Sequence, residues 1–151
     1  MNAHHHALVI KRTLWTGAIA ALSWALVPGA LHAATLTSKL TGEAEVPPVT
    51  TMGTGTATVG FDPATKVARW KVIYSGMSGP VTAAHLHGPA IPGQSASVVV
   101  PFKGPLNSPI EGEATLTEAQ AADLLAGKWY VNLHTAAKPS GEVRGQLTVS
   151  P

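Results

Sequence analysis

The chain has 151 residues, enough for one domain, and it contains no cysteine. The absence of cysteine excludes a disulfide framework and metal sites built on thiolates, such as zinc fingers, iron–sulfur clusters and blue-copper centres. Only 12% of the residues are charged and the formal net charge is +2, which gives no electrostatic basis for binding nucleic acid or an anionic membrane surface.

Residues 1–33 have the pattern of a secretory signal peptide. Lys11-Arg12 precedes an uncharged apolar run, which ends in Pro28-Gly29 followed by alanines. A basic start, an apolar centre and a small-residue exit are typical of a signal that is cleaved on export, and we expect cleavage near Ala33 or Ala34. The alternative is an uncleaved signal anchor, because the apolar run approaches the roughly 20 residues that span a bilayer.

Cleavage would place the mature protein in the periplasm or outside the cell, free of the membrane. Four of the seven histidines and two of the ten basic residues would leave with the signal. The mature chain would then have a formal charge of zero, and its only histidines would be His85, His87 and His134. A metal site in the mature protein would have to use these nitrogens or oxygen ligands.

From residue 35 onward, apolar residues alternate with polar ones, which predicts β-strands. Residues 54–61 and 66–74 are joined by the turn sequence Asp-Pro-Ala-Thr and therefore predict a hairpin. Trp70 and Trp129 lie on the apolar faces of their strands, so we expect both to be buried. Further strands are predicted over 81–88, 95–102, 128–135 and 142–149.

One segment departs from this period. Thr117 and Gln120 have the spacing of a capping box and Gly127 supplies a stop, so a short helix is predicted over 117–126. Loops rich in glycine and proline separate the predicted strands. The pattern therefore predicts an all-β fold with one short helix: an antiparallel β-sandwich from about residue 35 to 150, of the Greek-key, immunoglobulin-like or superoxide-dismutase-like kind.

Two histidines, His85 and His87, flank a single leucine in the predicted strand 81–88. On a strand, residues i and i+2 point to the same side, with Cα atoms about 6.5–7 Å apart. Two imidazoles in this arrangement can converge on one ion at metal–nitrogen distances of about 2.0–2.1 Å. The pair is therefore a candidate bidentate unit for a metal.

The third histidine, His134, also lies at a strand end, immediately before a loop. If the two strand ends lie on the same side of the sandwich, the three side chains can meet and form a metal site. Copper(II) is the favoured ion because it binds nitrogen ligands most tightly among the divalent first-row metals, and zinc is the alternative. Water or a carboxylate such as Glu142 would complete the coordination.

The same histidines have a structural interpretation that needs no metal. A histidine at a strand end can bond a backbone carbonyl or pair with a carboxylate, and Glu142 is the obvious partner. Glu142 and Arg144 share one strand face, so a His–Glu–Arg network is an alternative, and we favour structural roles for these two residues. Glu43 and Glu45 are expected to share a strand face without a second carboxylate against them.

Four segments of the chain together resemble the CHRD domain, the repeat named from chordin that also occurs singly in many exported bacterial proteins. They follow the order of the family and cover nearly the whole predicted mature chain, as one CHRD domain over 35–150. The resemblance implies an all-β domain and no established catalytic activity. In chordin the repeats belong to a secreted protein that binds growth factors, a role that does not transfer to a single domain. The four segments are 40–49, 83–90, 116–135 and 139–147.

The His-Leu-His strand is also similar to the copper-binding His-x-His strand of Cu/Zn superoxide dismutase. The chain lacks the cysteines of that enzyme and has too few histidines for its full copper and zinc set, so a dismutase-like enzyme ranks last. We expect a small exported binding module, without catalytic residues, that holds copper or zinc at His85, His87 and His134. The alternative is a structural, adhesion or protein-interaction module without metal, whose ligand would be a protein partner.

Overall fold

The computed structural model describes residues 33–151, and the predicted signal peptide, apart from its last residue, lies outside them. The described chain forms nine strands and one helix. The elements are β1 (Ala34–Thr41), β2 (Thr54–Asp62), β3 (Val67–Ser75), β4 (Val81–His87), β5 (Val98–Pro101), β6 (Ile110–Thr115), α1 (Glu118–Leu125), β7 (Tyr130–Thr135), β8 (Lys138–Gln146) and β9 (Thr148–Val149).

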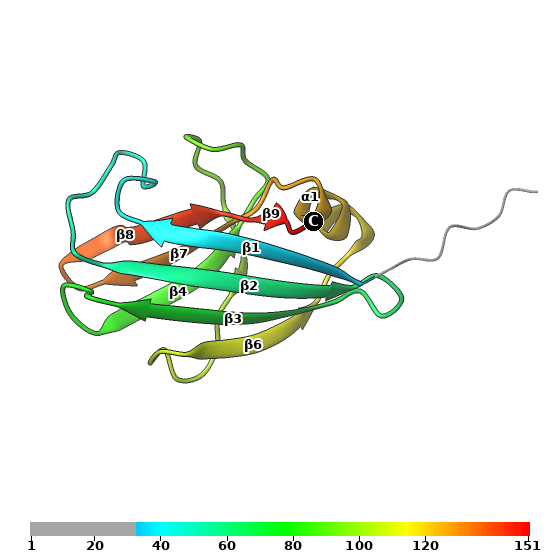
Figure 1. The fold of residues 1–151 in the computed structure, drawn as a ribbon, viewed down its shortest axis with the longest axis horizontal. Coiled ribbons are helices and arrows are strands. Elements are labelled where there is room, and N and C mark those ends of the chain that lie inside the picture. The colour runs from blue at the N-terminus through cyan, green and yellow to red at the C-terminus, as the bar shows by residue number, and fades with distance from the viewer. Residues whose placement is uncertain (1–32) are drawn as a thin grey trace, which may run out of the picture.

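The strands form one antiparallel sheet in the order β5-β4-β7-β8-β1-β2-β3-β6, with β9 beside β1. β8 and β1 meet at a single paired position, Thr41 opposite Arg144, and the sheet folds over there. As a result, β1, β2, β3 and β6 form one layer, and β4, β7 and β8 lie behind it (Figure 1). The predicted all-β antiparallel fold is confirmed, and the sandwich is one folded sheet that nearly closes on itself.

The core lies between the two layers and consists of aliphatic and aromatic side chains. Alternate positions of β2 and β3 are buried, as the period of two requires. Trp129 is 1% exposed and Trp70 is 6% exposed, so the predicted burial of both is confirmed. Trp70 stacks on Phe102 with ring centroids 4.5 Å apart, which ties β3 to the chain that follows β5.

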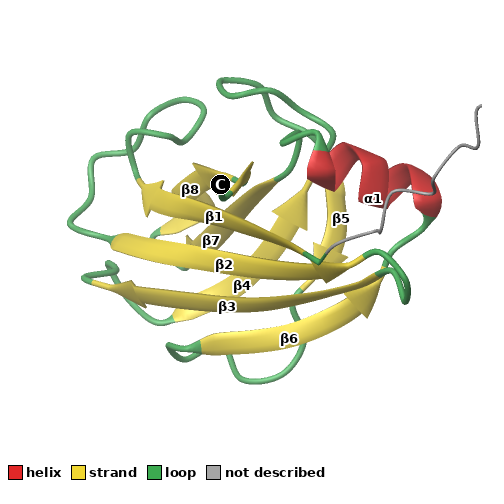
Figure 2. Ribbon diagram, turned by 45° about the vertical axis from the view of Figure 1, so that its right-hand side comes forward, coloured by secondary structure: helices red, strands yellow, loops and turns green. Residues whose placement is uncertain are grey.

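The helix begins as the sequence predicts. The Thr117 side chain accepts a hydrogen bond from the Gln120 N–H, and the Gln120 side chain accepts one from the Thr117 N–H, which completes the capping box. Ala121 and Leu124 are buried, and the helix packs at one end of the sandwich (Figure 2). No helix within residues 33–151 is long and apolar enough to cross a membrane.

Two predicted strands differ from the structure by more than two residues at one end. Instead of one strand over 142–149, the chain forms β8 and then β9, because the Leu147 N–H bonds the Trp129 carbonyl before the chain moves beside β1. β5 covers only Val98–Pro101 of the predicted 95–102. Strands β1 and β6 have no predicted counterpart, because their threonines, glycines and charged residues give weak apolar periodicity.

The prediction that Glu43 and Glu45 share a strand face is wrong. The chain turns directly after β1, because the Gly42 carbonyl accepts hydrogen bonds from the N–H groups of both Glu45 and Val49. Both acids therefore lie in a loop. This loop and the loop after β4 both project from the same edge of the sandwich (Figure 1).

Candidate metal centre

Strand β4 places His85 and His87 on one side of the sheet. The residues between and before them, Leu86 and Ala84, are 0% and 1% exposed and point into the core. Because side chains alternate along a strand, the two histidines point to the opposite, outer face. Their ring centroids lie 5.3 Å apart. The two rings therefore share one face at the separation that the sequence spacing implies.

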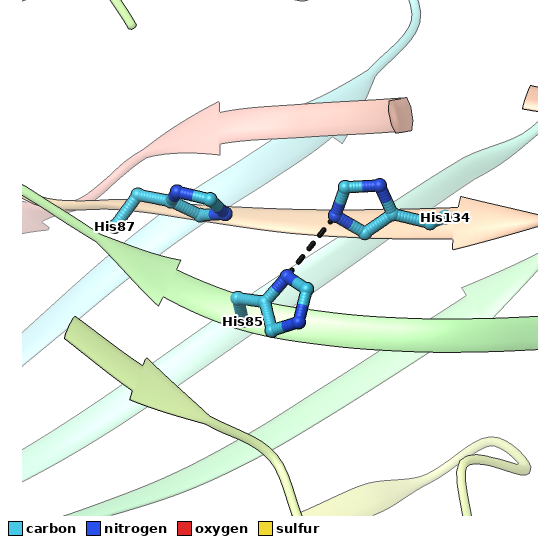
Figure 3. A group of neighbouring side chains, drawn as sticks. All are labelled: His85, His87 and His134. Atoms are coloured by element: carbon cyan, nitrogen blue, oxygen red, sulfur yellow. Dashed lines mark hydrogen bonds between the residues drawn. The ribbon is translucent and has the colours of Figure 1, made fainter. Parts of the chain in front are cut away.

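Strand β7 brings the third histidine to this pair. In the β4–β7 register, Asn132 lies opposite His85 and His134 lies opposite Ala83, so His134 is the diagonal neighbour of His85 on the same face. The structure thus brings together all three histidines that the sequence singles out (Figure 3). One ring nitrogen from each lies within 4.8 Å of the others.

Hydrogen bonds to backbone carbonyls fix the tautomers of two rings. His87 Nδ1 lies 3.0 Å from the Ala96 carbonyl oxygen, and His134 Nδ1 lies 3.0 Å from that of Pro139. A carbonyl only accepts, so each Nδ1 carries the proton and each Nε2 keeps its lone pair. His134 Nε2 then accepts a hydrogen bond from His85 Nδ1, 3.1 Å away.

His87 Nε2 is buried and has no hydrogen-bond partner in the described part of the chain. With its proton on Nδ1, this nitrogen is a pure acceptor, and an unpaired buried acceptor is unfavourable by roughly 1–3 kcal/mol. The same lone pair is a metal ligand, so a bound ion would satisfy it. Two nitrogens bound to one ion at about 2.0–2.1 Å lie about 3–4 Å apart, and the His85–His134 separation of 3.1 Å already matches.

The pKa of each histidine in the cluster lies below its ordinary value. Burial lowers the pKa of His134 and of His85, and the His134 and His87 rings lower that of His85 further. Burial also lowers the pKa of His87, and the positive charge of Arg144 lowers it further. The neutral imidazole is the form that binds metals, so these shifts keep the cluster ready for a cation at neutral pH.

A family model, that of the CHRD domain, matches residues 36–147. The chain belongs to the CHRD domain family. The matched range contains all three histidines and reaches from β1 to the end of β8. No match was found among the curated proteins or the solved structures.

In this CHRD domain an aromatic residue supports the His87 ring. The ring of Tyr130 stacks on that of His87, with centroids 4.8 Å apart and planes 2° from parallel. The Tyr130 hydroxyl accepts from the Ala96 N–H at 3.1 Å and lies 3.3 Å from the Ala96 carbonyl, which His87 Nδ1 also contacts. Tyr130 and the Ala96 peptide together fix where His87 Nε2 points.

The CHRD domain also buries a carboxyl group beside the cluster, which the sequence patterns do not reveal. Glu45 is 7% exposed, and its carboxylate accepts a 2.5 Å hydrogen bond from the Asn132 amide, directly across from His85. Burial raises the pKa of Glu45 to about 7, against the opposing effects of Arg144 and Asn132. The lone signal in the sequence is an acidic residue on a loop, which no strand or helix period can place.

Glu142 makes neither of the contacts that the sequence suggests for it. Glu142 neither contacts the histidines nor pairs with Arg144; it is fully buried and accepts hydrogen bonds from the hydroxyls of Thr51, Ser78 and Thr135 at 2.6 Å each. Burial alone would raise the pKa of Glu142, but these bonds hold it at about 2. Glu142 is therefore a structural anchor, and the proposed His–Glu–Arg network does not form.

Proposed function

We propose that this CHRD domain binds one transition-metal ion through His85, His87 and His134, with copper as the favoured ion and zinc as the alternative. The observation that carries the proposal is the buried lone pair on His87 Nε2, which has no partner among the described residues and lies beside two further ring nitrogens. A purely structural histidine would have its second nitrogen paired or in water.

The donor set favours copper. It consists of three neutral imidazoles, and within residues 33–151 no carboxylate or other metal-ligating side chain joins them. Among divalent first-row metals, copper binds such nitrogen sets most tightly. Zinc would need a water to complete its tetrahedron and therefore competes as the second candidate.

A structural role of the histidines has its own support, because His87 bonds the backbone of the loop before β5 and His134 bonds the backbone at the start of β8. These bonds use Nδ1 of each ring and leave Nε2 for the metal. The two roles are therefore compatible, in the way that metal-binding histidines usually donate their other nitrogen to a carbonyl. The measured affinity for a metal ion distinguishes a metal site from a purely structural histidine cluster.

We also propose that the domain works outside the cytoplasm. The support is the basic start and the apolar run before residue 34. Mass spectrometry of the protein isolated from its native host should find a first residue near Ala34. A product that retains residues 1–33 and remains in the membrane fraction would contradict cleavage.

The metal proposal is tested by titration with copper(II) and zinc(II). Because His4, His5, His6 and His32 also offer imidazoles, the test uses the full chain with these four changed to alanine. We expect one saturable equivalent, which His87→Ala abolishes while exposed Arg69→Ala leaves it intact. Equal binding by His87→Ala and its parent would contradict the proposal, as would the absence of binding.

A further inference from the structure

Three planar groups from three neighbouring strands stack beside the histidine cluster. His87 on β4 lies against one face of the Tyr130 ring on β7. The guanidinium carbon of Arg144, on β8, lies 3.4 Å from the Tyr130 ring centroid. His87 already covers one face and β8 lies on the other side of β7, so Arg144 covers the opposite face. Tyr130 thus separates a candidate ligand from a cation by one ring.

Arg144 is a buried charge with little compensation. The residue is 2% exposed, and within the described residues no carboxylate oxygen lies within 4.0 Å of its guanidinium. Its Nη2 donates to the Gln94 carbonyl. The nearest acid in its field, Glu45, has its pKa raised to about 7 by burial and is therefore only partly ionised at neutral pH. At neutral pH the charge of Arg144 is therefore compensated only in part by a neighbouring carboxylate.

We infer that Arg144 and Tyr130 make the three-histidine site prefer copper(I) to copper(II), with Tyr130 as the positioning residue that holds His87 and Arg144 as the charge that sets the preference. This inference rests on the proposed metal-binding function. A fixed positive charge nearby destabilises a divalent ion more than a monovalent one, because the repulsion scales with the charge of the ion.

The ligand set points the same way. Copper(II) gains from anionic ligands and a tetragonal set of four or more donors. Here the ligands are three neutral rings, and the carboxylate of Glu142 is occupied by three hydroxyls on other segments. Partial burial of the cluster further disfavours the higher charge, since solvent compensates a buried divalent ion less well.

The test measures the affinity of the full chain for each copper ion separately, with His4, His5, His6 and His32 changed to alanine. Copper(I) is supplied in ascorbate with bicinchoninate as the competing chelator, and copper(II) in air with glycine as the competitor. The measured quantity is the ratio of the two affinities, taken at pH 7 for the Arg144 variants, where Glu45 is only partly ionised, and at pH 8 for Glu45→Gln, where Glu45, whose pKa is about 7, is mostly ionised.

Arg144→Met should reduce the preference for copper(I) by about tenfold or more, mainly through tighter copper(II) binding. Arg144→Lys, which keeps the charge, should retain most of the preference. Arg69→Met is the matched control, because Arg69 is an exposed arginine on β3 that pairs with Glu113. It should leave the ratio unchanged. Tyr130→Phe should weaken both copper affinities together, because it removes the hydroxyl that holds the Ala96 peptide beside His87 without altering charge.

Glu45→Gln provides an independent test of the inference if Arg144→Met does not fold. Removing this negative charge should shift the ratio toward copper(I), opposite to the effect of Arg144→Met. An unchanged ratio in Arg144→Met, or in Glu45→Gln when Arg144→Met is unfolded, would overturn the inference. Binding of neither copper ion by the parent chain would instead overturn the proposed metal site itself, so the two failures are distinguishable.

Discussion

His85 Nδ1 lies 3.1 Å from His134 Nε2, so two candidate ligands on neighbouring strands are already joined by a hydrogen bond. The bond holds the rings at the separation that a shared ion requires. Metal binding would place the His85 proton on Nε2 instead of Nδ1, replace this contact by two metal–nitrogen bonds and also use the unpaired Nε2 of His87. The cluster is therefore arranged before an ion arrives, which reduces the ordering cost of binding.

His134→Ala should lower copper affinity by more than about 100-fold, because it removes one of three ligands and frees His85. Thermal unfolding of the metal-free variant should change little, since the lost bond to the Pro139 carbonyl lies at the exposed start of β8. Isothermal titration calorimetry measures the copper affinity, and differential scanning calorimetry of the same samples measures the thermal unfolding. Lys138→Ala, at the start of β8 beside Pro139, is the control and should behave like the parent chain.

Metal binding should persist to a lower pH than ordinary histidines would allow. The pKa values of His85, His87 and His134 are all lowered, so the rings stay neutral below the usual histidine value of 6.5. The copper affinity, corrected for the competitor, should be nearly constant from pH 8 to about 6.5 and fall below that. A decline that begins above pH 7 would be inconsistent with the lowered pKa values.

The same shifts predict the stability of the metal-free protein. For each ring the folded-state pKa is below the unfolded one, so protonation favours the unfolded chain. The contribution is fully present above about pH 6.5 and is lost as the pH falls through the folded-state values. Denaturant unfolding at several pH values measures this loss, which the triple variant His85→Gln, His87→Gln and His134→Gln should reduce.

Glu45 should affect stability with the opposite sign. Its pKa is raised from 4.5 to about 7, so the fold favours the protonated acid and becomes less stable as the pH rises through this window. Glu45→Gln keeps an oxygen that can accept from Asn132 and carries no charge. We expect it to stabilise the fold at pH 8 by about 2 kcal/mol and to be nearly neutral at pH 4. Equal effects of Glu45→Gln on stability at both pH values would contradict the raised pKa of Glu45.

Glu142→Gln distinguishes a structural role of Glu142 from a role as a metal ligand. The carboxylate joins three hydroxyls and the Ser78 N–H from segments far apart in the sequence, and its pKa is held at about 2. Replacing it should destabilise the fold by about 2–4 kcal/mol, since several hydrogen bonds to a charged group weaken at once. Copper affinity of the folded variant should remain within about threefold of the parent. A larger loss of copper affinity would indicate that Glu142 belongs to the metal site.

The fold class and the His85–His87 pair are predictable from the sequence because both depend on periods. The period of two identifies most of the strands, the side of β4 that carries His85 and His87, and the burial of Trp70 and Trp129. The capping box at Thr117 and Gln120 fixes the start of the helix. The family resemblance, confirmed over residues 36–147, adds the extent of the domain.

The parts that escape prediction depend on pairing between distant segments. Whether His134 meets His85 is decided by the β4–β7 register, which no local pattern encodes. Glu45 reaches Asn132 from a loop, 87 residues away in sequence. The β7–β8 register shifts between Leu133 and Thr135, in the part of the ladder next to Glu142, so the simple alternation of Glu142 with Arg144 is misleading.

X-ray absorption spectroscopy at the copper edge tests the central claim most directly. The sample is the full chain with His4, His5, His6 and His32 changed to alanine, loaded with one equivalent of copper. We predict three imidazole nitrogens at about 2.0 Å from the ion, and a visibly smaller imidazole contribution in His87→Ala. A first shell dominated by oxygen, or a spectrum unchanged by His87→Ala, would contradict the three-histidine centre.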